Sequence, residues 1–568
     1  MRPLALAGPR PWHRWAAALL GLTLTMATQP TRPAGAQGDC ALAPFRERID
    51  ATLASMTIDH EETSAATDSR GQPFTRIDVG FSGTVDGCVT KGGPLQMMTR
   101  EPYSWLYDAP DIALPQEHLL SVDRTKPYPL PIRAGDGNTS PRYYARAAFR
   151  AADGAGMTVL LPTAGTPWNG KLFLLQHGSG MYTPMEALTE PTPDAPLPAG
   201  IGRPLFAPAM MDQGYAVAYL RKDGVRPPLG ASEAVLRDGT TLRTTFVGHA
   251  GIMVAMAEFA QRYVAQAMGQ PPRRTYYYGH SGGGIAARIT NYSGANVGHD
   301  GRPVIDGFIA DDAGNGLYLP IAFEGGQDVL FRDAAERARL VPQIDVTRQL
   351  YNPLSYLPAK RLNAELLREK GLGEKHRLYE VRGVSHFDAG QLDLAGSQDV
   401  LDLGPLIYAL AERLDAWVER GEAPPASKAD APGFDPALAL PEVACPLGEY
   451  YAGPAGFSGN AAAQRTAFAA YDGASLEPVN ADTGAFIDMN DNRLQDLRET
   501  VDAAWQRLGL LPAGQPFTPE RYATCLSAAA SDLVAEGLLP SWASVWYPSQ
   551  AAALLERSGA RWAAAPGA

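Results

Sequence analysis

The sequence predicts an α/β protein with a mostly parallel sheet flanked by helices at its centre, a β-rich region before it and a helical region after it. From Trp168 onward, short apolar runs such as 171–176 (KLFLLQ) and 215–220 (YAVAYL) alternate with helical patterns. Strands of a parallel sheet are apolar along their whole length because helices cover both faces. A further observation is a glycine-rich strand-to-helix turn at 279–283 (GHSGG).

The chain has 568 residues, of which 45% are hydrophobic and 19% charged, and this composition predicts a globular protein of two or three domains. Changes in composition and hydrophobic pattern along the chain predict five parts. They are an export signal at 1–36, a β-rich region at 37–165, the α/β core at 166–421, a linker rich in proline and alanine at 422–441, and a helical region at 442–568. In the outer regions, alternation predicts a strand over 75–90, and amphipathic patterns predict helices over 494–511 and 518–539.

Residues 1–36 have the pattern of a cleaved export signal. Three arginines precede the apolar run 15–28, and residues 34–36 (AGA) supply the small side chains that a signal peptidase requires. The run is short for a membrane span, and no later stretch approaches about 20 uninterrupted apolar residues. We therefore expect a secreted or periplasmic protein with no membrane span in its mature form; an uncleaved anchor is the alternative.

The charge of the chain argues against nucleic acid as a partner. Cleavage after residue 36 removes four arginines and no acids, so the formal net charge changes from −12 to about −16. A field of this sign repels phosphate backbones and weakly disfavours anionic polymers as substrates.

The four cysteines predict two disulfides, because an even number in an exported chain is typical of a bridged framework. The sequence allows three pairings. We favour Cys40–Cys88 and Cys445–Cys525, because this pairing keeps each bridge local. The spacing of cysteines and histidines is not that of a zinc site, and we expect no metal and no cofactor.

A nucleophilic serine is predicted at the glycine-rich turn. Gly279-His280-Ser281-Gly282-Gly283 fits the pattern G-x-S-x-G and lies between the aromatic strand 274–278 and a helical pattern. Residues two positions either side of such a serine have no room for a Cβ, since the helix and the next strand crowd the turn. The turn lifts the hydroxyl of Ser281 out of the sheet.

A neutral serine is a weak nucleophile and needs a histidine base that is held by an acid. Among nine histidines, only His386 stands just beyond a strand, late in the core and after the serine. The backbone N–H groups of Gly282 and of Gly178 or Ser179 are the expected oxyanion donors, because residues 177–180 end an early strand opposite the turn.

Four residues compete for the role of the acid. Asp328 is the first choice, because it follows a strand-like run and a glycine turn. However, only about ten residues separate this run from the preceding strand, which is short for a parallel crossover. If 340–347 (LVPQIDVT) is the true neighbouring strand, Asp345 becomes the rival, and Asp311 or Asp312 at the end of GFIADD could also reach the histidine.

These motifs resemble those of the α/β-hydrolase superfamily over about residues 168–420, and more narrowly those of bacterial exported "alpha/beta hydrolase domain" esterases. The likeness rests on the serine turn, on QHGSG at 176–180 and on EVRGVSHFDAG at 380–390. It implies Ser281 as nucleophile and His386 as general base and acid. The sequence departs from the family at the acid, where GGQDV at 325–329 matches only in part.

The combined prediction is a secreted serine hydrolase that cleaves a small or polymeric carboxylic ester through a Ser-His-Asp triad and an acyl-enzyme. An amidase or peptidase with the same triad and a noncatalytic binding protein on a hydrolase scaffold are the alternatives. Separately, oxygen-bearing side chains at Asp488–Glu499 follow the spacing of a calcium loop, but Arg493 replaces the usual glycine, so an ordinary helix with an acidic first turn is favoured.

Overall fold

The structure is a computed structural model, and all the residues that it describes belong to one compact unit, Asp39–Ala568. It describes residues 43–67, 73–89, 143–162, 167–176, 210–211, 213–221, 231–236, 239, 241–245, 250–292, 295–313, 323–324, 327–328, 338–351, 356–369, 371–386, 401–452, 466–473 and 499–562. The predicted export signal lies outside these ranges. None of the described helices combines the length and the apolar character needed to cross a membrane.

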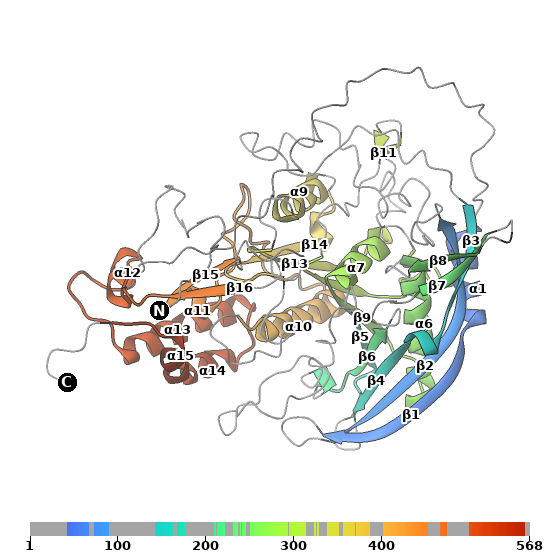
Figure 1. The fold of residues 1–568 in the computed structure, drawn as a ribbon, viewed down its shortest axis with the longest axis horizontal. Helices are drawn as coiled ribbons and strands as arrows, with labels where there is room; N and C mark the ends of the chain where they lie inside the picture. The colour runs from blue at the N-terminus through green and yellow to red at the C-terminus, as the bar shows by residue number, and fades with distance from the viewer. Residues whose placement is uncertain are drawn as a thin grey trace, which may run out of the picture. The chain divides into compact units, whose positions relative to one another are not determined.

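A mixed sheet of twelve strands forms the centre, and the predicted α/β class is confirmed. Parallel strands follow one another in the order β14, β13, β10, β9, β5 and β6, of which all but β10 are labelled in Figure 1. Their bounds are His376–Val381, Gln343–Arg348, Gly307–Asp311, Arg274–His280, Lys171–Gln176 and Ala216–Arg221. The carboxyl ends of these strands therefore share one edge of the sheet, where ligands bind in open α/β folds.

The remaining strands extend the sheet beyond β6 with antiparallel pairs, and the first four of them make the N-terminal region β-rich, as predicted. They are β1 (Thr57–Thr67), β2 (Pro73–Val89), β3 (Tyr143–Phe149), β4 (Gly156–Pro162), β7 (Ala231–Leu236) and β8 (Thr241–Thr245). The strand predicted at 75–90 is thus part of β2.

Two apolar cores cover the two faces of the sheet, and β5 shows how one strand serves both. Leu172 and Leu174 pack in one core, whereas Phe173 and Leu175 pack in the other, because successive side chains of a strand point to opposite faces. The first core includes residues of α1 (Phe45–Ser55), α6 (Ala250–Met268) and α7 (Gly282–Tyr292). The second includes residues of α10 (Gly404–Arg420).

The segment predicted as a linker is part of the folded core. Its backbone pairs with β14 at two places, where Lys428 bridges to Tyr379 and Leu438 to Val381. β14 is the last strand of the sheet on this side, so the segment satisfies peptide groups that an edge strand leaves open. Composition predicted a spacer here, but the proline-rich chain forms single bridges in place of a regular strand.

The C-terminal region is helical, as predicted, and also contains a small hairpin. Its elements are α11 (Pro441–Ala444), β15 (Gly448–Ala452), β16 (Thr466–Ala470), α12 (Val501–Arg507), α13 (Pro519–Glu536), α14 (Ala543–Ser549) and α15 (Ala551–Ser558). The helix predicted over 494–511 is shorter among the described residues, because the backbone of Thr500 is extended. Thr518 caps α13 by accepting a hydrogen bond from the N–H of Arg521 at 3.3 Å.

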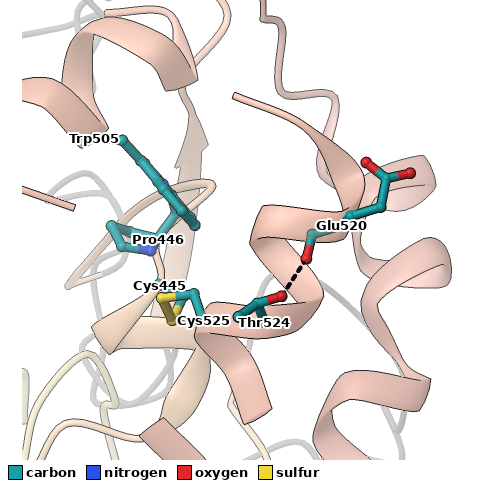
Figure 2. Close-up of a disulfide and its surroundings, with 6 residues drawn as sticks. All are labelled: Cys445, Pro446, Trp505, Glu520, Thr524 and Cys525. Carbon is teal, nitrogen blue, oxygen red and sulfur yellow. Dashed lines mark hydrogen bonds between the residues drawn. A yellow bond between two sulfur atoms is a disulfide. The ribbon is translucent and has the colours of Figure 1, made fainter. Parts of the chain in front are cut away.

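A disulfide ties the start of this region to α13, and this confirms one of the two predicted bridges. Figure 2 shows Cys445 joined to Cys525. The two cysteines are 80 residues apart in sequence, and their Cα atoms lie 6.0 Å apart. The indole of Trp505 donates a hydrogen bond to the carbonyl of Pro446 at 2.7 Å, directly beside the bridge. Cys40 lies outside the described residues, so its pairing with Cys88 stays a prediction.

Replacing both Cys445 and Cys525 by alanine should lower the free energy of unfolding by about 4 kcal/mol, because the bridge restricts a long loop in the unfolded chain. Urea unfolding followed by tryptophan fluorescence measures the change. Thr524→Ala is the control, since its hydroxyl bonds only to the Glu520 carbonyl of its own exposed helical turn in Figure 2 and should alter stability by less than about 0.5 kcal/mol. Equal effects of the two changes would contradict a stabilising bridge.

Candidate active site

The predicted nucleophile turn is present between β9 and α7. β9 ends at His280, α7 begins at Gly282, and Ser281 between them has a φ of 57°. A serine in this left-handed region is strained and persists only where the surroundings hold it. The N–H of Ser281 donates a hydrogen bond to the carbonyl of Asp311 at 3.0 Å, and this bond helps to fix the conformation.

The glycines around the serine are required by close contacts between backbones. A Cβ on Gly279 would lie 2.3 Å from the carbonyl of Gly283, and one on Gly283 would lie 2.2 Å from the carbonyl oxygen of Gln176. The hydroxyl of Tyr277 adds to this packing by donating to the carbonyl of Gly283 at 3.1 Å. The crowding that the sequence pattern predicted is therefore real.

His386 lies beside this turn, and its ring is oriented by a carboxylate. Its Nδ1 lies 2.5 Å from Oδ2 of Asp312, both side chains being buried. A carboxylate accepts, so Nδ1 carries the proton, and the neutral ring then has its lone pair on Nε2. This is the tautomer in which a histidine can act as a general base toward a hydroxyl.

Two aromatic rings confine the imidazole of His386. Tyr351 stacks on it with ring centroids 4.1 Å apart and an interplanar angle of 22°. The ring of His280, the residue before the serine, lies 4.6 Å from it on centroids. His280 also donates from Nε2 to the carbonyl of His386 at 2.9 Å, so the turn and the histidine loop are joined directly.

Asp312 directly follows β10 and is held by groups from two other elements. Its φ is 42°, its N–H donates to the carbonyl of Val346 at 2.8 Å, and its Oδ1 accepts from the N–H of Arg348 at 3.2 Å. The ammonium of Lys360, on α9 (Tyr356–Glu369), also donates to Oδ1. Oδ1 is thus used for support, and Oδ2 faces His386.

A second buried ion pair lies next to the first. The guanidinium of Arg348 binds the carboxylate of Asp311 at 2.6 Å and donates to the carbonyl of His386 at 2.5 Å. The hydroxyl of Tyr278 donates to the same carboxylate at 2.6 Å. Buried charges are tolerated only when paired, and here two carboxylates are balanced by two cations.

The electrostatics favour an ionised acid beside a neutral base. Burial alone would raise the pKa of the Asp312 carboxyl, but the charge of Lys360 and the hydrogen bond from His386 lower it well below its usual range. Burial lowers the pKa of the His386 imidazole; Asp312 opposes this, and the charges of Arg348 and Lys360 reinforce it. His386 is therefore held in its proton-accepting form at neutral pH.

The carboxylate that contacts His386 differs from the first choice made on sequence. Asp328 lies in β12 (Gln327–Asp328), which pairs with β11 (Phe323–Glu324) in a two-stranded sheet separate from the main one. Asp345 lies within β13, where its carboxylate binds Arg288 at 2.5 Å and His376 at 3.0 Å. The contact with His386 that the sequence assigned first to Asp328 is made by Asp312.

One of the three residues expected to donate to an oxyanion, Gly282, lies among the described residues. Gly282 is the first residue of α7, and N–H groups in the first turn of a helix have no partner within the helix. Its N–H therefore has the position expected of one donor. Gly178 and Ser179 lie outside the described residues, so their role stays a prediction.

Two groups of residues, the calcium-like pattern and a histidine cluster, carry side chains of the kinds that bind metals. Of Asp488–Glu499, only Glu499 is described, and its carboxylate binds Arg507 at 2.7 Å. The ligand atoms of His280, Asp312 and His386 lie within 4.8 Å of one another. However, the carboxylate of Asp312 already bridges a lysine and an imidazole, which is the pattern of an acid–base network rather than of a cation site.

Comparison with known proteins agrees with the fold. Residues 249–432 match a family model described as "Alpha/beta hydrolase domain". This match and the order of the parallel strands identify an α/β-hydrolase domain, as the sequence motifs predicted. A comparison with curated proteins finds no match.

Solved structures with low identity resemble part of the chain. TT1662 from Thermus thermophilus is 17% identical, with a TM-score of 0.23, and 44% of this chain and 95% of that chain are covered. Est1E from Butyrivibrio proteoclasticus is 12% identical, with a TM-score of 0.24, and 46% of this chain and 96% of that chain are covered. LpqC, a poly(3-hydroxybutyrate) depolymerase from Bordetella parapertussis, is 17% identical, with a TM-score of 0.29, and 48% of this chain and 86% of that chain are covered. Scores this low assign no substrate.

Gly283→Ala should destabilise the turn by about 2 kcal/mol or more, since the new methyl group would overlap the carbonyl of Gln176. Thermal unfolding measures the loss. Gly373→Ala is the matched control, because its Cβ would meet nothing closer than 3.5 Å. A Gly283→Ala protein as stable as the control would mean that the two backbones are not in close contact.

Proposed function

We propose that the protein is a serine hydrolase that cleaves carboxylic esters, with Ser281 as nucleophile, His386 as general base and acid, and Asp312 as the acid of the triad. The observation that carries the proposal is the 2.5 Å contact between His386 Nδ1 and Asp312 Oδ2 beside a serine with a φ of 57°. The family-model match to an α/β-hydrolase domain supports a hydrolytic activity.

The reaction follows from the tautomer of His386. Ser281 Oγ attacks the ester carbonyl while His386 Nε2 takes its proton, and Asp312 stabilises the imidazolium. The N–H of Gly282 donates to the developing oxyanion. When the intermediate collapses, the C–O bond to the alcohol breaks and His386 delivers the proton to the departing oxygen. Water, deprotonated by His386, then cleaves the acyl-enzyme and restores the serine.

The choice of an ester and the place of action rest on the sequence. The likeness to exported esterases in the serine and histidine motifs supports an ester rather than an amide. The signal pattern of residues 1–36 supports export, and the Cys445–Cys525 bridge fits an oxidising compartment. Parallel assays with aryl esters, short aliphatic esters, a polymeric ester and a peptide distinguish the ester activity from its amide alternative.

Ser281→Ala should abolish turnover of the best ester in that panel while the protein stays folded, because no other described group at the turn offers an activated hydroxyl. Hydrolysis rates and labelling by a fluorophosphonate probe are the measurements. Circular dichroism serves as the control for folding. Turnover or labelling that survives in the folded variant would refute the proposal.

Asp312→Asn should lower kcat by about a thousandfold or more, because an amide cannot hold the imidazolium and can favour the wrong tautomer. Asp328→Asn, the matched change at the residue first expected on sequence, should leave kcat within about twofold of the wild type. Steady-state kinetics on one ester compares the two. A large loss in Asp328→Asn with little change in Asp312→Asn would reassign the acid.

A further inference from the structure

We propose that Lys360 is a positioning residue of the active site, which fixes the Asp312 carboxylate toward His386 and uses its charge to keep His386 unprotonated in mildly acidic solution. This inference rests on the proposed function, because it concerns the same acid and base. The described residues show no other cation that contacts the carboxylate of Asp312 through its side chain.

Lys360 occupies a position of α9 that an apolar residue would normally fill. Leu357, Ala364 and Leu367 are buried at three, four and seven residues from it, so all four side chains share one face of the helix. Lys360 is also buried, with a side-chain exposure of 1%. A buried ammonium is unfavourable unless it is paired, so its presence on this face calls for a specific partner.

The contacts of Lys360 all lead to the catalytic groups. Its ammonium donates to Oδ1 of Asp312, which leaves Oδ2 for His386. The same ammonium lies 5.6 Å from the ring centroid of Tyr351, and this ring stacks on His386. Lys360 thus supports the acid directly and the base through an aromatic ring, while its own chain position is far from either motif.

The charges around His386 show why the cation matters for protonation. The described charged and titratable groups around it are Asp311 at the end of β10, Asp312 directly after β10, Arg348 at the end of β13, Lys360 on α9 and His280 at the end of β9. The ring of Tyr351 stacks on it. With His386 neutral, two anions balance two cations. Protonation of His386 adds a third positive charge to a buried cluster.

The direction of the effect follows from this balance. Burial lowers the pKa of His386, Asp312 raises it, and both Arg348 and Lys360 lower it again. Burial also lowers the pKa of Lys360, and the contact with Asp312 opposes that loss of its proton. Removal of the Lys360 charge should therefore raise the pKa of His386, so that the base becomes protonated at a higher pH.

The test compares Lys360→Met with Lys360→Arg in the full chain, by the pH dependence of kcat/KM on an aryl ester. At low pH the profile falls as His386 becomes protonated, and this part of the curve is its acid limb. In Lys360→Met, the acid limb should move to higher pH by about one unit. The value of kcat should also fall about tenfold or more. In Lys360→Arg, which keeps the charge, the limb should stay at the wild-type pH. Lys375→Met is the matched control, since this lysine donates to the carbonyl of Leu340, away from the site.

An acid limb that stays in place in Lys360→Met, with an equal loss at every pH, would overturn the inference and leave Lys360 a structural residue. If Lys360→Met does not fold, Lys360→Gln replaces it, because the glutamine amide can still donate a hydrogen bond to Asp312 but carries no charge. The acid limb should again lie at a higher pH than in the wild type. An unchanged limb in Lys360→Gln also overturns the inference.

Failure of the proposed function gives a different result. It appears as labelling or turnover that persists in Ser281→Ala, whatever happens at residue 360. An NMR titration of the His386 imidazole, assigned with His386→Gln, follows protonation without any turnover. A His386 pKa that does not rise in Lys360→Met refutes the role of the lysine even if ester hydrolysis is established.

Discussion

The organisation of this site depends on a carboxylate that must stay ionised although it is shielded from solvent. Asp312 is fully buried, and without compensation its charge would be lost to protonation. Compensation comes from Lys360 and from the hydrogen bond to His386, which belong to elements far apart in the chain. The ionised carboxylate of Asp312 is therefore stable only once the sheet and α9 have assembled around it.

The parallel sheet makes this assembly possible because it gathers several chain segments at one edge. β9, β10, β13 and β14 are consecutive in the sheet, and the residues at or just beyond their carboxyl ends are Ser281, Asp312, Arg348 and His386. Backbone hydrogen bonds extend the register past the strands, as from Ser281 to Asp311 and from Asp312 to Val346. The strained serine is thus braced by the strand that carries the acid.

The sequence was informative where a local pattern carries the chemistry. Ser281 is recognisable because the glycine pattern around it lies within a few residues of the chain, and His386 because it follows a strand late in the core. The acid was ambiguous, since which strand lies beside β9 is decided by long-range pairing. The useful signal was the doubled aspartate ending GFIADD, directly beside the serine strand.

Lys360 had no signal in the sequence, because a lysine in a helical pattern is normally placed on the solvent face. The linker was also misjudged on composition. Proline and alanine resemble a spacer, yet Ala429 and Leu438 are buried against the outer strand. In both cases the residues that determine the structure, Asp312 for Lys360 and β14 for the predicted linker, lie on a different element. A short stretch of sequence around either feature does not include them.

The bridging of this segment to β14 changes where the hydrolase domain ends. The family model stops at residue 432, whereas the peptide groups of Glu380 and Arg382 are still bonded to Leu438. A fragment trimmed to the matched residues would leave open the strand that leads toward His386, and such an edge can recruit another chain. The functional boundary for expressing this domain alone therefore lies further along the chain than sequence similarity places it.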